Sequence, residues 1–136
     1  MLDVAGNLLA IPIKLLDLVR GVKTLQRDSA DRIADLFGKI GEALAVAAAE
    51  IRQGNVPHGV CGQLMAYADA FYDTTRKVLG DDKARELADL LHENYNVERM
   101  AASLSSDPGR CDSAARQLEE SAGRFMALGF IVRAKA

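Results

Sequence analysis

The first twenty residues, MLDVAGNLLAIPIKLLDLVR, are the most apolar segment of the chain, and their polar positions have helical spacing. On a helix of 3.6 residues per turn, the polar or small positions fall on one narrow stripe: Asp3, Asn7, Ala10, Lys14 and Asp17. Apolar side chains cover well over half of the circumference of this helix. They are Leu2, Val4, Ala5, Leu8, Leu9, Ile11, Ile13, Leu15, Leu16, Leu18 and Val19. We expect such a helix to be buried on most sides, or to bind a membrane or a groove in a partner.

Pro12 predicts an interruption of this helix, because a proline inside a helix removes one backbone hydrogen bond, at a cost of about 3 kcal/mol. Either the helix is kinked at Pro12, or it begins there and residues 1–11 form a looser apolar arm. The segment lacks the basic start and the cleavage site of a signal peptide. Nor is it a conventional membrane span, because each charged residue would cost about 2.5–3.5 kcal/mol near the bilayer centre. Several copies with facing polar stripes would avoid most of that cost.

Beyond Gly21, apolar residues recur at intervals of three and four, which predicts helices and no strands. We expect helices at about 24–53, 57–79, 81–94 and 110–133, and a short segment at 97–104. Glycine and proline predict the breaks between them, at Gly54 to Pro57, at Gly80 and at Ser105 to Gly109. The predicted fold is all-α. It is a four-helix bundle over residues 24–136, with an additional apolar N-terminal helix or arm over residues 1–23.

Composition narrows the classes of function. The chain has 136 residues, 49% of them hydrophobic and none of them Trp, so small aliphatic side chains build the core and favour closely packed helices. Its net charge of −2 argues against nucleic-acid binding, which needs a concentrated basic face. Cys61 and Cys111 lack the spacing of a disulfide scaffold or a redox motif, which fits a reducing cytosol, and we expect both to be buried.

No catalytic, metal-binding or cofactor-binding pattern is recognisable. His58 and Cys61 lie one turn apart, but a zinc site needs three or four ligands and no second pair is visible. His92 and Glu93 are adjacent, so they point in different directions on a helix and we expect a solvated surface pair. The acidic pairs Asp81-Asp82 and Glu119-Glu120 are typical of helix starts and exposed faces. We therefore expect no enzyme activity, no catalytic residues, no metal and no cofactor.

Four glycines lie inside predicted helices, at Gly38, Gly41, Gly123 and Gly129. Each costs up to about 1 kcal/mol relative to alanine. One explanation is close packing between helices, and the other is that the glycines soften helices that rearrange when the protein changes state.

An apolar N-terminal segment followed by a helical bundle resembles the Bell and HeLo-like cell-death domains, and is similar to the four-helix domain of the mixed-lineage kinase-like pseudokinase. Three stretches carry the resemblance: Ile51 to Gly59 (IRQGNVPHG) with Cys61, Asp81 to Leu87 (DDKAREL), and Glu120 to Phe125 (ESAGRF). The resemblance implies a bundle that an upstream receptor or signalling protein activates. Such a bundle oligomerises and damages membranes in regulated cell death.

The leading hypothesis is therefore a membrane-disrupting or pore-forming effector in bacterial regulated cell death or immunity. The protein would be cytoplasmic at rest and move to the inner face of the plasma membrane as a homo-oligomer. The apolar residues Leu2, Val4, Leu8, Leu9, Ile11, Ile13, Leu15, Leu16, Leu18 and Val19 would insert into membrane or bind a partner. The candidates for lipid headgroups are Lys14, Arg20, Lys23, Arg124, Arg133 and Lys135.

Two other interpretations remain open. The chain fits a non-enzymatic helical adaptor, whose apolar surface binds a partner helix or a second copy of itself. It also fits a helical fragment of a larger multidomain protein that continues beyond Ala136. A stoichiometric complex without lipid would favour the adaptor, and lipid-dependent oligomers would favour the effector.

Overall fold

The computed structural model of the chain describes residues 4–102, 104 and 108–136, and within those ranges the side chains from Leu9 onward. Six helices make up its regular structure: α1 (Val4–Arg20), α2 (Arg27–Arg52), α3 (His58–Leu79), α4 (Asp81–Asn94), α5 (Val97–Ala102) and α6 (Pro108–Ala134). The described residues contain no strand. The prediction of an all-α fold is therefore confirmed.

The observed helices lie close to the predicted ranges, and α4 has the predicted bounds. Helix α6 begins earlier than expected, because Pro108 and Gly109 form its first residues instead of ending a loop. Proline suits a first helical turn, where its missing N–H has no helical partner to lose. Three residues of the predicted loop, 105–107, lie outside the described ranges.

Helix α1 continues through Pro12, with helical residues on both sides of it. The alternative in which the helix begins at Pro12 is therefore wrong for the described residues. Pro12 itself is buried, so its ring adds to the packed surface of α1.

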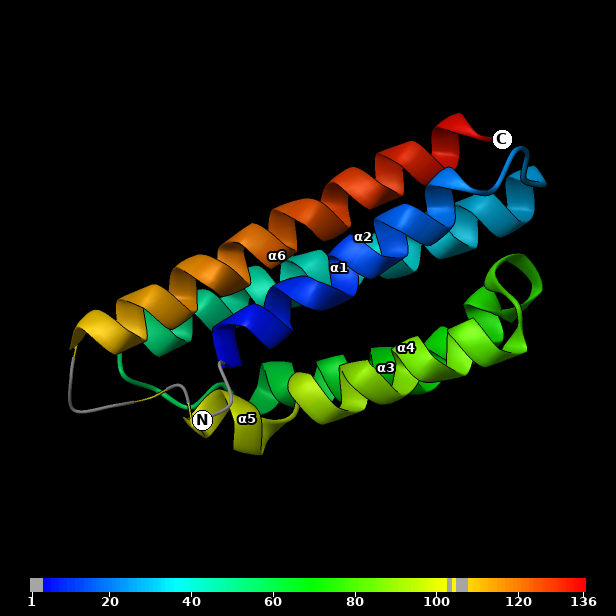
Figure 1. Cartoon of the computed structure of the whole chain (residues 1–136). Coiled ribbons are helices and arrows are strands. Elements are labelled where there is room, and N and C mark those ends of the chain that lie inside the picture. The colour runs from blue at the N-terminus through cyan, green and yellow to red at the C-terminus, as the bar shows by residue number, and fades with distance from the viewer. Residues whose placement is uncertain (1–3, 103, 105–107) are drawn as a thin grey trace.

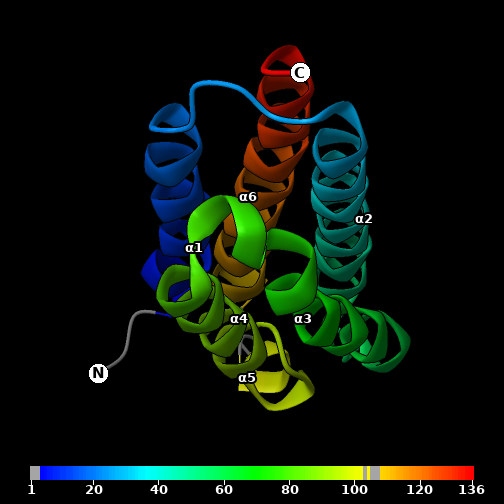
Figure 2. The same ribbon diagram turned by 90° about the vertical axis from the view of Figure 1, so that its right-hand side faces the viewer.

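The five long helices surround one core as a closed ring. Each packs against two neighbours in the order α1, α6, α2, α3, α4 and back to α1, as the end-on view in Figure 2 shows. Helices α1, α2 and α6 lie on one side and the α3–α4 hairpin on the other (Figure 1). The short α5 packs against α3. Helix α1 thus closes the ring between α4 and α6.

Aromatic side chains from three helices meet at the centre of the ring. Phe37 of α2 lies 6.3 Å from Phe71 of α3 and 6.0 Å from Phe125 of α6 between ring centroids, and all three are fully buried. Ile11 and Leu15 of α1 belong to the same cluster and are also fully buried. The leading helix therefore shares its core with the rest of the bundle.

Glycine allows α2 and α6 to pack closely. A Cβ atom on Gly41 would lie 2.9 Å from the carbonyl oxygen of Ala122, and one on Gly129 would lie 3.3 Å from that of Ala34. Close packing is therefore confirmed as the reason for these two glycines. It does not explain Gly38 and Gly123, because a Cβ atom at either position would meet nothing within 4 Å.

Candidate functional site

The candidate site is helix α1 with the surfaces that hold it in the ring. Among its predicted membrane or partner residues, Ile11, Leu15 and Val19 are buried. Leu9, Leu16 and Leu18 are half-buried, and Ile13 is 44% exposed. Leu2 lies outside the described residues, and Val4 and Leu8 lie in α1 at positions whose side chains are not described. The apolar face of α1 is thus largely directed into the bundle.

The width of that face is explained by two neighbours on different sides. Helix α1 packs against α6 and, less extensively, against α4. A helix between two neighbours needs a wider apolar face than one that rests on a single surface. Lys14 and Asp17, two members of the predicted polar stripe, are both exposed to solvent.

The α1–α4 seam is open to solvent and charged. Its groove of about 360 Å³ is lined by Lys14, Asp17 and Leu18 of α1 and by Lys83, Glu86 and Leu87 of α4. The Glu86 carboxylate lies 3.9 Å from the Lys14 ammonium and 3.5 Å from the Lys83 ammonium, and each of these side chains is about half exposed. Exposed ion pairs contribute about 0–1 kcal/mol each. The seam between α1 and α4 is therefore a weakly held side of the ring.

Lys135 fastens the connection between α1 and α2. Its backbone carbonyl accepts a hydrogen bond of 3.0 Å from the Leu25 N–H, and its ammonium donates one of 2.8 Å to the Val22 carbonyl. Val22 and Leu25, in the connection between α1 and α2, are therefore both hydrogen-bonded to the residue that follows α6.

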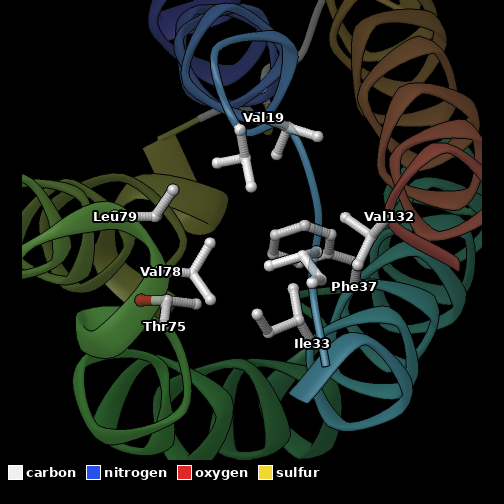
Figure 3. A pocket seen from close by; sticks show the side chains of 9 residues that line it. Val19, Ile33, Phe37, Thr75, Val78, Leu79 and Val132 are labelled. Atoms are coloured by element: carbon white, nitrogen blue, oxygen red, sulfur yellow. The ribbon is translucent and has the colours of Figure 1, made fainter. Parts of the chain in front are cut away.

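A small apolar cavity lies at the same end of the bundle. Figure 3 shows the side chains of Val19, Ile33, Val78 and Val132, from four different helices, pointing toward it. Its volume is about 10 Å³, which is the size of a single water site. Its polar neighbour Thr75 already donates a hydrogen bond of 2.7 Å to the Phe71 carbonyl. The cavity is too small for a ligand.

Most of the predicted headgroup cations contact other groups of the chain. Arg133 pairs with Asp31 and Asp35 of α2, at 3.7 and 2.6 Å. Arg124 pairs with Glu120 at 3.2 Å. Lys14 and Lys135 make the contacts given above, and Arg20 and Lys23 are exposed. Four of the six cations therefore already have a partner within the chain.

The weaker candidates for chemistry, His58 and Cys61, differ in their surroundings. No group of three His, Cys, Asp or Glu side chains that could hold a metal occurs in the part of the chain that the structure describes. Burial, together with nearby Glu50, raises the pKa of the Cys61 thiol to about 11, so the thiol stays protonated at neutral pH. His58 is exposed at the start of α3.

His92 lies at the surface, as expected, and also makes two hydrogen bonds within the α3–α4 hairpin. Its Nδ1 lies 2.9 Å from the Ala88 carbonyl and its Nε2 lies 2.6 Å from the Asp69 carboxylate. Both partners are acceptors, so both ring nitrogens donate when the imidazole is protonated. Asp69 lies 11 residues before Gly80 and His92 lies 12 residues after it, a nearly symmetric spacing that brings residues of a helical hairpin together. This symmetry was the available sequence signal.

Ion pairs between α2 and α6 were not predicted. Arg52, at the end of α2, binds both Asp112 and Glu119 of α6, and its bond to Asp112 measures 3.3 Å. Arg52 and Arg116 hold the pKa of Asp112 below its ordinary value. Glu119 is therefore a structural partner of Arg52 within the bundle. No local pattern indicates these pairs, because about 60 residues separate the partners.

Comparison with known proteins gives no relative for this site: no family model, curated protein or solved structure shows significant similarity to the chain. Within the described residues, no helix combines the length and hydropathy that crossing a bilayer requires.

Proposed function

We propose that this chain is a membrane-disrupting effector of bacterial regulated cell death or immunity. In this proposal α2, α3, α4 and α6 form a four-helix body and α1 is its releasable element. At rest the ring is closed in the cytoplasm. An upstream signalling protein opens it, and α1 then enters the inner face of the plasma membrane as part of a homo-oligomer.

The observation that supports this proposal is a contrast between the two sets of contacts that α1 makes in the ring. Three of its apolar side chains, Ile11, Leu15 and Val19, are buried in the bundle, whereas its seam with α4 is a solvated groove with exposed ion pairs. Each buried side chain stabilises the closed ring by roughly 1.5–3 kcal/mol relative to exposure to water. A lipid interface accepts the same side chains, so release of α1 becomes favourable only where lipid is present.

The charges of α1 shape the open state. Lys14 and Asp17 share the polar stripe, so a single α1 would lie in the interface with that stripe toward water. Several copies would turn their stripes toward one another around a water-filled path. In either arrangement, the cations nearest to the lipid headgroups are Lys14, Arg20 and Lys23. As the four-helix body approaches the membrane, it adds Arg124, Arg133 and Lys135.

Reversing the charge at the seam tests the proposal. Glu86→Lys places a third cation beside Lys14 and Lys83 and should open the α1–α4 seam. We expect faster dye leakage from anionic liposomes than with the unchanged chain, at equal helicity by circular dichroism. Glu93→Lys is the matched control, because it makes the same charge change at an exposed position of α4 that does not line the groove. Equal leakage rates for the two variants would contradict the proposal.

A second candidate function, a non-enzymatic adaptor or interaction module, is favoured by one observation. Phe130 is 73% exposed on α6, and Met126, one turn earlier, is 38% exposed. A surface aromatic of this kind is typical of protein contacts. An adaptor would form a stoichiometric complex with its partner in the absence of lipid and would leave liposomes intact.

A further inference from the structure

Two features of the outer face of α6 are not explained by packing within the chain. The first is Phe130, whose ring is 73% exposed. The second is Gly123, an exposed glycine in the middle of a long helix, where alanine would be more favourable. A Cβ atom at Gly123 would meet nothing within 4 Å, so no neighbouring helix requires the glycine. Gly129 on the same helix differs, because there the backbone of Ala34 lies close.

Phe130 and Gly123 lie on the same face of α6. They are seven residues apart, which is nearly two full turns. Ala127, also exposed, lies between them, so the face presents a small residue, another small residue and then a large aromatic ring. The exposed Phe130 ring and the uncovered position at Gly123 therefore lie along one line on the surface of α6.

This arrangement is self-complementary when two copies of α6 run antiparallel. With a twofold axis between Met126 and Ala127, residues near the midline of this face lie opposite those whose numbers add to 253. Phe130 of each copy then lies over Gly123 of the other copy. A closed twofold contact needs this reciprocity.

The charges on the same face agree with that register. Arg133 and Glu119 both contact α2, so they lie on the same flank of this face, and the twofold axis brings Arg133 close to Glu119 of the second copy. Both side chains are about half exposed. Arg124 lies on the other flank, where Ala127 and Ile131 of the second copy are nearest, so no like charges face each other. Opposite charges at matching positions favour one register over its neighbours.

We propose that the α6 face around Gly123, Ala127 and Phe130 binds a second copy of this chain in an antiparallel, twofold-symmetric dimer. Phe130 of each copy fills the open position at Gly123 of the other. The dimer forms in water through a face formed by α6, and so does not depend on release of α1 or on lipid. One helix pair buries less than the roughly 1,200 Å² of a stable interface, so the association is weak and depends on concentration.

Sedimentation of the full chain without lipid, from micromolar to near-millimolar concentration, tests the dimer. The unchanged chain should pass from monomer to dimer. Phe130→Ser removes the ring, and Gly123→Leu fills the open position while favouring the helix, so each should weaken association by about tenfold or more. Val46→Ser is the matched control, because Val46 is 48% exposed on α2 and should leave association unchanged.

Cross-linking tests the register directly. A cysteine at Ala127 lies beside the twofold axis and should give covalent dimers with a short bis-maleimide, whereas a cysteine at exposed Ser113 should not. The native Cys61 and Cys111 are buried, which keeps the background low. A chain that stays monomeric throughout, or association that survives both Phe130→Ser and Gly123→Leu, would overturn the inference. Liposome leakage by Phe130→Ser is measured separately, so failure of the dimer is distinguishable from failure of the membrane function.

Discussion

Two glycines one turn apart on α2 differ in what surrounds them. Gly41 lies against the backbone of α6, where a Cβ atom would approach the Ala122 carbonyl to 2.9 Å. Gly38 faces open space. Gly41→Ala should therefore destabilise the fold by about 1–3 kcal/mol, because the helices must move apart. Gly38→Ala should stabilise it by up to about 1 kcal/mol. Urea unfolding of both variants measures the difference, and equal effects would contradict the close packing of α2 and α6.

His92 gives the α3–α4 hairpin a pH-dependent contact. Burial by itself would lower the pKa of His92, but the hydrogen bonds to Asp69 and to the Ala88 carbonyl, with the charges of Asp69 and Asp89, raise it above the ordinary value. A raised pKa in the folded state means that the contact stabilises fully below the unfolded pKa of about 6.5. Its contribution is lost as the pH rises through the folded pKa.

The expected effect of this contact is small, because His92 and Asp69 are 40% and 75% exposed. Exposed pairs contribute about 0.2–1 kcal/mol. Unfolding midpoints of the unchanged chain and of His92→Asn should differ at pH 5.5 and converge at pH 8.5. A difference that grows with pH would show that the sign is wrong.

At the scale of single helices, α1 is part of the core. Leu15 is fully buried, whereas Ile13 on the same helix is 44% exposed. Leu15→Ala should lower the free energy of unfolding by about 2–5 kcal/mol, in one cooperative transition. Ile13→Ala should change it by only about 0.5 kcal/mol. If Leu15→Ala left the global transition unchanged, α1 would unfold independently of the bundle.

This packing affects how α1 can be tested. Deleting residues 1–20 would remove Ile11, Leu15 and Val19 from the core and leave their contacts on α6 and α4 open to water. Loss of activity in such a deletion would therefore not separate a membrane role from a failure to fold. Substitutions and cross-links at the exposed seam leave the core intact.

At the scale of the whole molecule, helix positions were predictable and helix partners were not. Spacing of three and four residues located the helices, since an apolar stripe indicates which face of a helix is buried. Phe37, Phe71 and Phe125 belong to such stripes and are fully buried. The apolar circumference of α1 indicated more than one contact, but not that α4 and α6 provide them. Which helices become neighbours depends on side-chain fit between distant segments.

The long-range contacts around the candidate site were the hardest to predict from the sequence. Arg133 and Lys135 looked like free cations near the C-terminus, yet Arg133 pairs with α2 and Lys135 fastens the connection after α1. Their partners lie 98 and 113 residues away. Local patterns carry no information on such pairs, whereas Asp69 and His92 are related through a single turn.

Locking α1 to α4 tests the central claim most directly. In a Lys14→Cys/Glu86→Cys variant, a short, cleavable bis-maleimide joins positions whose native side chains lie 3.9 Å apart. Before cross-linking, this variant lacks the seam ion pair and should release dye from anionic liposomes. The cross-linked form should not, and cleavage of the linker should restore leakage. An Asp69→Cys/His92→Cys cross-link between α3 and α4 is the control and should leave leakage unchanged. Leakage by the locked form at the rate of the unlocked one, or no leakage from any form, would contradict release of α1.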